Sequence, residues 1–392
     1  MCRCAVEQRT EDRGQWTEDR GRQVKKTLRE IEWKARALFE RVLFFFIRAK
    51  KLDAEKLDLS SLKSVLVVRQ HNELGDMLIS SPMFRALKEK FPGAKVVCVA
   101  AKANLPVARG IPFIDEVVHY DSKRALRNPF YFIGLILKLR RERFDAAIVP
   151  CTVSFSLTSA VIAFLSGARV KIGGETEDVF YGNGAIFFNV YLKIKKAGRP
   201  QVEINLDYLK PLGISGVTDK SYSFSVKEEE LERAAGWLAA KGILPAEVLI
   251  GVHPGAGKIE NRWGAGNFAS LINLITENRK AKVLVFYGPG EEKLKAELVS
   301  GLKQGYTVLD PVPLLSAAAF MKKCSLFVCN DTGVLHVAAA LGVNTFAVFG
   351  KGSPALWNPP GEGHFSVWDS QGIIGNITPA AAYAEFTRQA VL

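Results

Sequence analysis

Short apolar runs alternate with helical patterns along most of the chain. The run Val65-Leu66-Val67-Val68 is apolar at every position, which is typical of a strand covered on both faces of a parallel sheet. Segments with apolar residues three or four apart follow such runs, and this alternation predicts helices that connect parallel strands. The predicted strands are residues 64–69, 95–100, 116–119, 145–150, 248–252, 282–287, 326–329 and 345–349. The predicted helices are residues 77–91, 123–143, 227–241, 267–277, 291–302 and 332–341.

A break in this pattern divides the chain into two series. Residues 213–222 are rich in Gly, Ser and Asp and are interpreted as a linker. The pattern therefore predicts an α/β protein with two Rossmann-like, doubly wound parallel-sheet domains, residues 61–215 and 216–392, that face an interdomain cleft. Ligands of such sheets bind at the C-terminal ends of the strands, so the loops there are the first places to look for chemistry.

The N-terminal region has a different character. Residues 1–23 are polar and are predicted to be a disordered tail, whereas residues 24–60 begin with apolar positions at helical spacing. Residues 22–51 contain ten Lys and Arg and three Glu. The net charge of this segment is therefore +7 (10 − 3), over half of the +13 of the whole chain. Such a helix either packs on the protein's own core or lies on an anionic membrane, and the cluster Phe44-Phe45-Phe46 favours the membrane for residues 24–51.

Charge and cysteine usage exclude several classes of protein. The longest early apolar run, Val42 to Ile47, is far shorter than the ~20 residues that a membrane-spanning helix needs. The positive charge is confined to one segment without a recognition motif, so no nucleic-acid partner is expected. The first thirty residues lack the apolar core of a secretory signal, and the six cysteines form no C-x-x-C pair. We expect a cytoplasmic protein with reduced thiols and no metal site.

The first candidate loop follows the first predicted strand. It runs from Arg69 through His71 to Gly75 and Asp76 and is almost entirely polar. Gly75 permits a tight turn, and Asp76 stands at or near the start of the next helix. On the residues alone, helix capping is the favoured role of Asp76. The alternative is a general base that faces the cleft and removes a proton from an acceptor hydroxyl.

The second candidate loop, residues 253–264, combines glycines with positive charge. Gly255 and Gly257 let backbone amides approach an anion, and Lys258 and Arg262 add two cations. No Gly-Lys-Ser/Thr follows at the spacing of a P-loop, so this is not an ATPase motif.

The third candidate loop opens a very apolar helix. The amides of Thr332 and Gly333 are predicted to lie at its N-terminus, where the helix dipole favours a phosphate. Asp331 either accepts hydrogen bonds from sugar hydroxyls or only caps the helix, and His336 is either a ligand contact or a satisfied polar residue on the flank of the helix. Between the second and third loops, Glu291 and Glu292 either bind ribose hydroxyls or decorate a helix end.

In this order the loops resemble those of glycosyltransferase family 9, the ADP-heptose:lipopolysaccharide heptosyltransferases. The resemblance extends from about Lys63 to the C-terminus. The motifs that carry it are Leu74-Gly75-Asp76, Pro82, Arg85-Ala86-Leu87, His253-Pro254-Gly255-Ala256, Asp331-Thr332-Gly333, His336, Ala338-Ala339-Ala340-Leu341-Gly342 and Phe349-Gly350.

This resemblance implies a GT-B fold and inverting, metal-independent transfer of a heptose or related sugar. The donor would be an ADP-sugar that acts as a substrate, with no cofactor, and the acceptor a lipopolysaccharide core or similar lipid-linked saccharide. The enzyme would then act on the inner face of the inner membrane. The resemblance assigns the general base to Asp76, which reverses the ranking from the residues alone. The implied donor-binding residues are Gly255, Ala256, Lys258, Arg262, Glu291, Glu292, Asp331, Thr332, Gly333 and His336. The implied acceptor-binding residues are Arg69, His71 and Gly75.

The chain departs from the family pattern near the expected substrates. Asn261 stands where the family usually has a lysine, so Lys258 or Arg262 must supply that charge. Lys351-Gly352-Ser353-Pro354 replaces the usual Pro-Thr-Asp-Pro. Two alternatives therefore stay open. One is a GT-B transferase or epimerase that uses another nucleotide-sugar, and the other is a non-catalytic protein that binds a nucleotide-sugar or polyanion.

Overall fold

The computed structural model describes residues 49–52, 61–70, 73–151, 155–176, 184–196 and 198–389. The chain divides into one unit of residues 1–50 and another of residues 51–392, and the second holds all the helices and strands given below. The disordered tail predicted for residues 1–23 lies outside the described residues. So does the basic helix predicted for residues 24–60, apart from residues 49–52.

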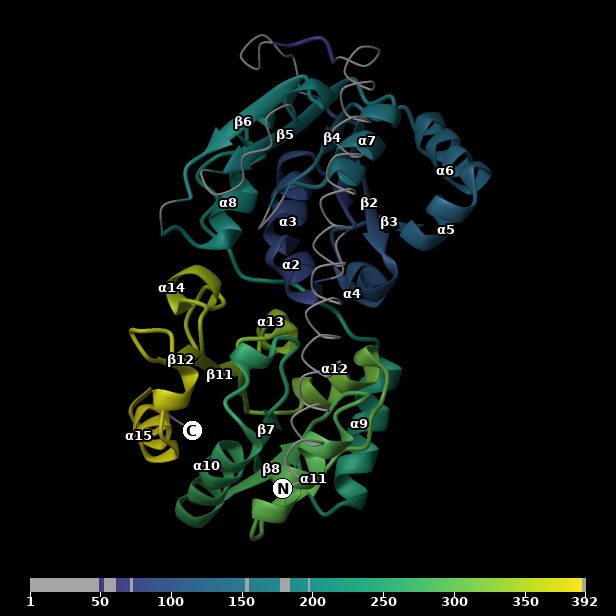
Figure 1. Cartoon of the computed structure of the whole chain (residues 1–392). Helices are drawn as coiled ribbons and strands as arrows, with labels where there is room; N and C mark the ends of the chain where they lie inside the picture. Colours follow the sequence, from purple (N-terminus) through teal and green to yellow (C-terminus); the bar gives the residue numbers. More distant parts are fainter. Residues whose placement is uncertain are drawn as a thin grey trace, which may run out of the picture. The chain divides into compact units, whose positions relative to one another are not determined.

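A six-stranded parallel sheet forms the first half of the large unit, with the strand order β3-β2-β1-β4-β5-β6 (Figure 1). Its central strand β1 is buried at all six positions, as its continuous apolar run predicts. Val65 of β1 lies between Val96 of β2 and Ala146 of β4. The strands are β1 (Ser64–Arg69), β2 (Lys95–Ala101), β3 (Glu116–Tyr120), β4 (Ala146–Ile148), β5 (Val170–Thr176) and β6 (Val190–Ile194). The helices are α2 (Leu74–Ile79), α3 (Ser81–Lys90), α4 (Leu105–Gly110), α5 (Ser122–Arg127), α6 (Pro129–Arg141), α7 (Leu157–Leu165) and α8 (Gln201–Asp207).

A second six-stranded parallel sheet has the order β12-β11-β10-β7-β8-β9, which repeats the topology of the first. Its strands are β7 (Val248–His253), β8 (Ala281–Val285), β9 (Tyr306–Val308), β10 (Leu326–Asn330), β11 (Asn344–Phe349) and β12 (His364–Trp368). Its helices are α9 (Glu228–Ala240), α10 (Ala265–Asn278), α11 (Glu292–Gly301), α12 (Leu314–Lys322), α13 (Gly333–Ala340), α14 (Pro354–Trp357) and α15 (Pro379–Gln389). Short 3₁₀ turns occur at Lys102–Asn104, Gly184–Phe187, Lys210–Leu212, Ile259–Asn261 and Ile374–Asn376. The predicted α/β fold of two doubly wound parallel sheets is confirmed.

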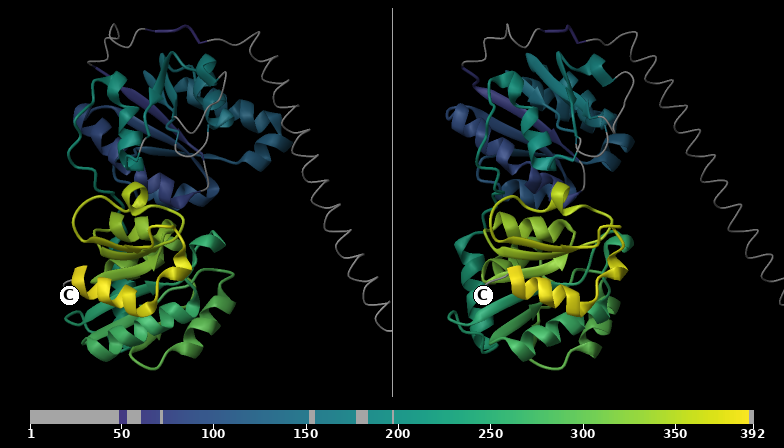
Figure 2. Two further views of the ribbon diagram at one scale, coloured as in Figure 1. Left: turned by 60° about the vertical axis from the view of Figure 1, so that its left-hand side comes forward. Right: turned by 90° about the vertical axis from the view of Figure 1, so that its left-hand side faces the viewer.

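The order of the strands marks where a ligand should bind. In each sheet the direction of winding reverses between the first and fourth strands, which are β1 and β4 in one half and β7 and β10 in the other. The carboxyl ends of strands at such a switch point form a crevice that binds ligands in open α/β sheets. Helices α2 and α13, which follow β1 and β10, pack against each other between the two sheets (Figures 1 and 2).

Two of the predicted helices are each divided into two. The helix predicted for residues 77–91 starts earlier, at Leu74, and is interrupted at Ser80. The helix predicted for residues 123–143 is interrupted at Asn128, whose extended backbone (φ −137°, ψ 95°) fits the preference of a residue that precedes proline. The side chain of Asn128 caps α6 by accepting a hydrogen bond from the amide of Tyr131. No helix among the described residues is both long enough and apolar enough to cross a bilayer.

Residues 214–227 form neither helix nor strand and connect the two halves. The guanidinium of Arg85 on α3 holds this linker by donating to the carboxylate of Asp219 and to the carbonyl and hydroxyl of Ser221. Directly after this anchor, the amide of Phe224 donates to Ala340 O of α13 (3.1 Å). The linker is therefore attached to both halves within a few residues.

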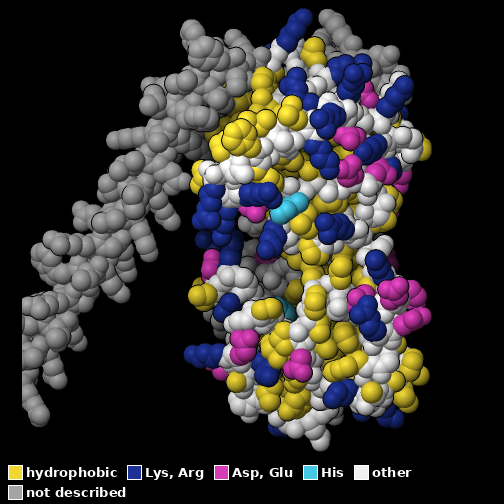
Figure 3. Space-filling view, turned by 90° about the vertical axis from the view of Figure 1, so that its right-hand side faces the viewer, with side chains coloured by type: hydrophobic (Ala, Val, Ile, Leu, Met, Phe, Trp, Pro, Cys, Tyr) yellow, Lys and Arg dark blue, Asp and Glu magenta, His cyan; other side chains and the backbone are white. Residues whose placement is uncertain are grey.

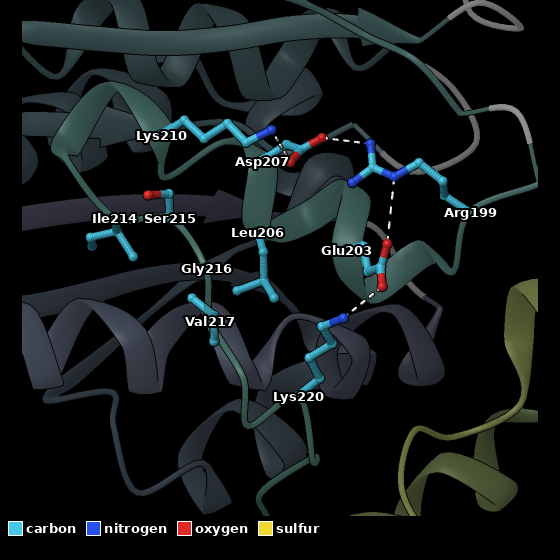
Figure 4. A pocket seen from close by; sticks show the side chains of 10 residues that line it. All are labelled: Arg199, Glu203, Leu206, Asp207, Lys210, Ile214, Ser215, Gly216, Val217 and Lys220. Carbon is cyan, nitrogen blue, oxygen red and sulfur yellow. Dashed lines mark hydrogen bonds and ion pairs between the residues drawn. The ribbon is translucent and has the colours of Figure 1, made fainter.

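A small cavity of about 190 Å³ lies beside the linker (Figure 4). Lys220 of the linker pairs with Glu203 of α8 (2.6 Å), and Arg199 and Lys210 both pair with Asp207 (2.7 Å each). These ion pairs neutralise most of the charge that lines the cavity and fix the linker to α8.

Every cysteine that the structure describes is buried and unpaired. Burial raises the pKa of the Cys98 thiol to about 12 and that of Cys151 to about 11, so both are protonated at neutral pH. These thiols act as apolar side chains of the core.

Candidate active site

A cavity of about 730 Å³ lies at the carboxyl ends of the central strands of both sheets. Its walls come from the segments that follow β1, β7, β10 and β11, which is where the strand order places a ligand crevice. The lining residues are Glu73, Leu74, Gly75, Asp76, Ile79, Gly257, Lys258, Glu260, Asn261, Asp331, Thr332, Gly333, Val334, His336, Lys351, Gly352 and Trp357. The cavity therefore brings the first, second and third predicted loops together.

Asp76 lines the cavity from the first turn of α2. The helix begins at Leu74, so Asp76 is its third residue, and the residue that precedes the helix is Glu73, whose side chain forms no capping hydrogen bond. Arg69, at the end of β1, supports it from behind. The side chain of Arg69 is 1% exposed and donates to Pro150 O (3.2 Å) and to Asp76 O (3.1 Å). A guanidinium nitrogen also lies 3.8 Å from the Asp76 carboxylate. Arg69, a predicted acceptor contact, is not among the residues that line the cavity.

The first and third loops meet in close backbone contact. A Cβ at Gly75 would lie 2.7 Å from the ring of His336, and a Cβ at Gly333 would lie 3.6 Å from the amide of Gly75. Gly75 thus allows α2 and α13 to approach each other more closely than a side chain at that position would permit, and Gly333 lies in van der Waals reach of α2. This approach brings Asp76 and the N-terminal turn of α13 to one cavity.

His336 is buried within this contact, at 4% exposure. Desolvation lowers the pKa of its imidazole to about 4, although the nearby carboxylate of Asp76 partly opposes this. The ring is therefore neutral at pH 7. Its Nδ1 has no hydrogen-bond partner among the described residues.

The second loop contributes Lys258 to the cavity, and the other predicted cation lies elsewhere. Nε of Arg262 donates to Ala256 O (2.7 Å), which fixes the loop. Asn330, fully buried at the end of β10, donates to Pro254 O (2.8 Å) and to Gly255 O (3.2 Å). Gly255, Ala256 and Arg262 are not among the lining residues. Of the two cations predicted for this loop, Lys258 lines the cavity and Arg262 does not.

Asp331 lies in the same cavity, and its carboxyl is strongly desolvated. Burial raises the pKa of Asp331 to about 6, with Lys258 partly opposing the shift. The amide of Asn261 approaches the carboxylate at 3.5 Å. Thr332, not Asp331, is the residue before α13, and no side chain caps that helix. The amides at the start of α13 therefore have no capping side chain, as an anion site requires.

Glu291 and Glu292 form hydrogen bonds with nearby groups of the protein. The carboxylate of Glu291 contacts His253 Nε2 (3.2 Å) and accepts from the amide of Gly288 (2.6 Å). The contact with His253 is the largest of several that lower the pKa of Glu291. Glu292 accepts from the amide of Gly290 (3.3 Å). Neither glutamate is among the residues that line the cavity, so their predicted contact with ribose stays a prediction.

The sequence analysis did not assign several of the lining residues to the site. Lys351, Gly352 and Trp357 follow β11, and their position after a strand was the signal that could have identified them. Lys351 adds a second cation, and Gly352 is a glycine because a Cβ there would overlap the carboxylate of Asp331. The predicted acceptor residue His71 lies outside the described residues. Within the described part of the chain, His, Cys, Asp and Glu form no group of three or more that could hold a metal ion.

Comparison with known proteins gives one consistent family. Residues 133–382 match the profile of the family described as glycosyltransferase family 9 (heptosyltransferase). Lipopolysaccharide heptosyltransferase 3 of Escherichia coli is 26% identical over 304 residues, which cover 75% of this chain and 86% of that protein. Lipopolysaccharide heptosyltransferase 2 of E. coli strain K12 is 26% identical over 305 residues, covering 73% and 82%.

Solved structures agree on the fold. A glycosyl transferase family 9 protein from Veillonella parvula superposes with a TM-score of 0.73 at 19% identity, covering 84% of this chain and 97% of that one. The E. coli heptosyltransferase WaaC with ADP-2-deoxy-2-fluoro heptose gives 0.65 at 19% identity, covering 83% and 100%. The two parallel sheets thus form a GT-B fold.

Proposed function

Because this chain belongs to glycosyltransferase family 9, we propose that it transfers a heptose from ADP-heptose to a saccharide acceptor of the lipopolysaccharide core. The observation that carries the proposal is that Asp76 and the N-terminal turn of α13 line one cavity. A transferase needs a base for the acceptor and a grip on the leaving diphosphate within reach of the same sugar. The choice of sugar is supported by the names of the relatives and by the bound sugar of WaaC.

The donor occupies the side of the cavity formed by the second half of the chain. Lys258, Lys351 and the uncapped amides of α13 face the diphosphate, and Asp331 accepts hydrogen bonds from the sugar hydroxyls. This assignment is supported by the positions of these residues in one wall and by the preference of helix N-termini for anions. Ionised Asp331 suits hydroxyl donors because bonds to a charged acceptor are stronger.

The reaction is a single displacement that inverts the anomeric centre. The acceptor oxygen forms a bond to the anomeric carbon while the bond from that carbon to the diphosphate oxygen breaks. The acceptor proton goes to the carboxylate of Asp76, and ADP leaves with the bonding electrons. Asp76 is suited to this role because Arg69 fixes its backbone and because neutral His336 beside it adds no competing positive charge.

The transfer needs no metal ion in this proposal. Two lysines and a helix N-terminus supply positive charge where the diphosphate departs, which is electrostatic stabilisation of the leaving group. The rate should therefore be unchanged when EDTA replaces Mg²⁺ in the assay. A rate that collapses with EDTA and returns with Mg²⁺ would refute this point and leave the family assignment intact.

The acceptor is lipid-linked, and the enzyme works at the inner face of the inner membrane. The support is the basic, amphipathic pattern of residues 24–51, which lie almost entirely outside the described residues. Deleting residues 1–50 should weaken binding to anionic liposomes while hydrolysis of the nucleotide-sugar continues. Unchanged liposome binding would contradict a role for this segment.

Asp76→Asn tests the function as a whole. Transfer measured by mass spectrometry should fall by about 10²–10⁴-fold, the range of general-base catalysis, with donor affinity nearly unchanged. Asp310→Asn is the matched control, because Asp310 is an exposed carboxylate outside the cavity. Wild-type transfer by Asp76→Asn would contradict the proposed base. Absence of transfer by the unmodified enzyme, with donor binding retained, would favour a binding protein.

A further inference from the structure

Helices α5 and α6 expose an unusual row of large apolar side chains. Leu126 is 88% exposed, Phe130 81%, Ile133 51% and Leu137 52%. These are four of the nine large hydrophobic side chains that are exposed in the described part of the chain. Residues 130, 133 and 137 share one face of α6 by helical spacing, and the buried residues of the helix, Leu135, Ile136 and Leu139, lie on its other side. We call these four side chains the apolar row.

The row is held on a rigid support. Tyr131 anchors the junction of the two helices, because its hydroxyl donates to His119 O (3.1 Å) and accepts from the amide of Asp121 (2.9 Å). The guanidinium of Arg124 covers the ring of Tyr131 at 4.8 Å. Asp121 and Asn128 cap the two helices. Helix α5 buries no side chain, so its packing does not explain why Leu126 is there.

Positive charge surrounds the apolar row. Residues 122–143 hold seven Lys and Arg and a single acidic residue, Glu142, which pairs with Lys95. Figure 3 shows the side of the molecule that bears these helices, with hydrophobic side chains beside clusters of Lys and Arg. Some of these cations are engaged, as Lys138 is with Glu116 (2.7 Å). The other six form no ion pair with any described residue, although Arg124 covers the ring of Tyr131 and Arg140 donates to Leu165 O: Lys123, Arg124, Arg127, Arg140, Arg141 and Arg143.

We propose that this face of α5 and α6 binds the surface of an anionic lipid membrane. The apolar row enters the boundary between headgroups and acyl chains, and the surrounding cations lie near lipid phosphates. The positive charge of this face favours an anionic lipid surface over the other partners that could cover it. A second copy of the chain would place two basic faces together, and the segment 24–51 is itself strongly basic. The face is therefore a membrane contact additional to the one proposed for residues 24–51. The proposed binding itself does not depend on the proposed function. Only its biological role does, which is to hold the enzyme near a lipid-linked acceptor.

A probe on the row tests the contact directly. Ile133→Cys in the full chain, with Cys2→Ser and Cys4→Ser, carries a nitrobenzoxadiazole fluorophore, because the cysteines that the structure describes are buried. Leu244→Cys, at a position 59% exposed in the second half, is the matched control. Vesicles that contain phosphatidylglycerol should brighten and blue-shift the probe at position 133 and leave the control unchanged, whereas pure phosphatidylcholine should affect neither.

Three outcomes would overturn the proposal. The first is a probe at position 133 that does not respond while the protein co-sediments with the vesicles. The second is an equal response at both positions. The third is a response that grows with protein concentration in the absence of lipid, which would mean that a second copy covers the face.

Substitutions provide a second readout. Phe130→Glu should weaken affinity for anionic vesicles about tenfold, because a charge replaces an inserted ring. The pair Arg127→Gln and Arg141→Gln should weaken it by about fivefold per cation. The matched controls are Leu244→Glu and Lys293→Gln, the latter on exposed α11. Wild-type affinity in Phe130→Glu and in the arginine pair would refute the proposal.

Transfer to a delipidated, water-soluble acceptor should be normal in every variant, so that failure of this contact is distinguishable from failure of the transferase itself.

Discussion

Asp331 links the stability of this protein to its proposed donor site, and Asp331→Asn should separate the two. Burial raises the pKa of Asp331 from 3.8 to about 6 in the folded chain. Above pH 6 the folded protein therefore holds a carboxylate that is easier to ionise in the unfolded chain. The difference in pKa corresponds to a cost of about 3 kcal/mol in the free energy of unfolding, at about 1.4 kcal/mol per pKa unit.

The sign of the pH dependence follows from the raised pKa. Below pH 3.8 Asp331 is protonated in both states, and the substitution should change little. Between pH 4 and 6 the wild type loses stability relative to Asp331→Asn, and above pH 6 the difference is constant. The unfolding entropy is about 2.1 cal/mol/K per residue, summed over the residues that the structure describes. With this entropy, a gain of about 3 kcal/mol should make Asp331→Asn melt about 4 °C above the wild type.

The same substitution should weaken donor binding. An amide forms weaker hydrogen bonds with sugar hydroxyls than a carboxylate does, so the Kd for ADP-heptose should rise about tenfold at pH 8. Thermal melts at pH 4.5 and 8, together with calorimetric titration of the donor, measure both effects. Asp310→Asn, outside the cavity, should change neither. If Asp331→Asn melts at or below the wild-type temperature at pH 8, the argument from desolvation is wrong.

Three further predictions concern the walls of the cavity. Gly75→Ala should destabilise the protein by about 1–3 kcal/mol, because the added methyl overlaps the His336 ring; Gly134→Ala on α6 is the matched control in a thermal melt, and equal stability of the two would contradict the close packing. Arg69→Met should lower kcat with little change in donor Kd, because it releases the backbone behind the base; a rise in Kd alone would show instead that this residue acts on the donor. Lys258→Ala should raise the donor Kd about tenfold, the loss expected for a charge-assisted bond, and unchanged calorimetric titration would exclude that bond.

The local patterns that predicted the fold succeeded where one signal dominated. The strand β1 was predicted at its observed bounds because four apolar residues are flanked by polar ones. Elements with mixed signals were missed. In β5, Gly173 and Gly174 interrupt the apolar run, and both are required because a Cβ would overlap Phe188 or the backbone of Leu192. The division of the long helix at Asn128 was visible in Pro129 but was outweighed by the apolar residues on both sides.

The candidate site was predicted to the level of loops, not of side-chain directions. Polar segments after apolar strands identified Asp76, Lys258 and Asp331, all of which line one cavity. The same rule also selected Arg69 and Glu291, whose side chains bond to neighbouring protein groups. Which face a loop side chain takes depends on long-range partners, such as the carbonyl of Pro150 for Arg69, and these are not encoded in local spacing.

The bonds of the linker to both halves limit how the two halves can move. Arg85 attaches Asp219 and Ser221 to the first half, the amide of Phe224 bonds to Ala340 of the second, and the next amide, that of Ser225, bonds to Gly110 of the first half again. Because neighbouring residues of the linker bond to different halves, a shift of one half along the other would break at least one of these bonds.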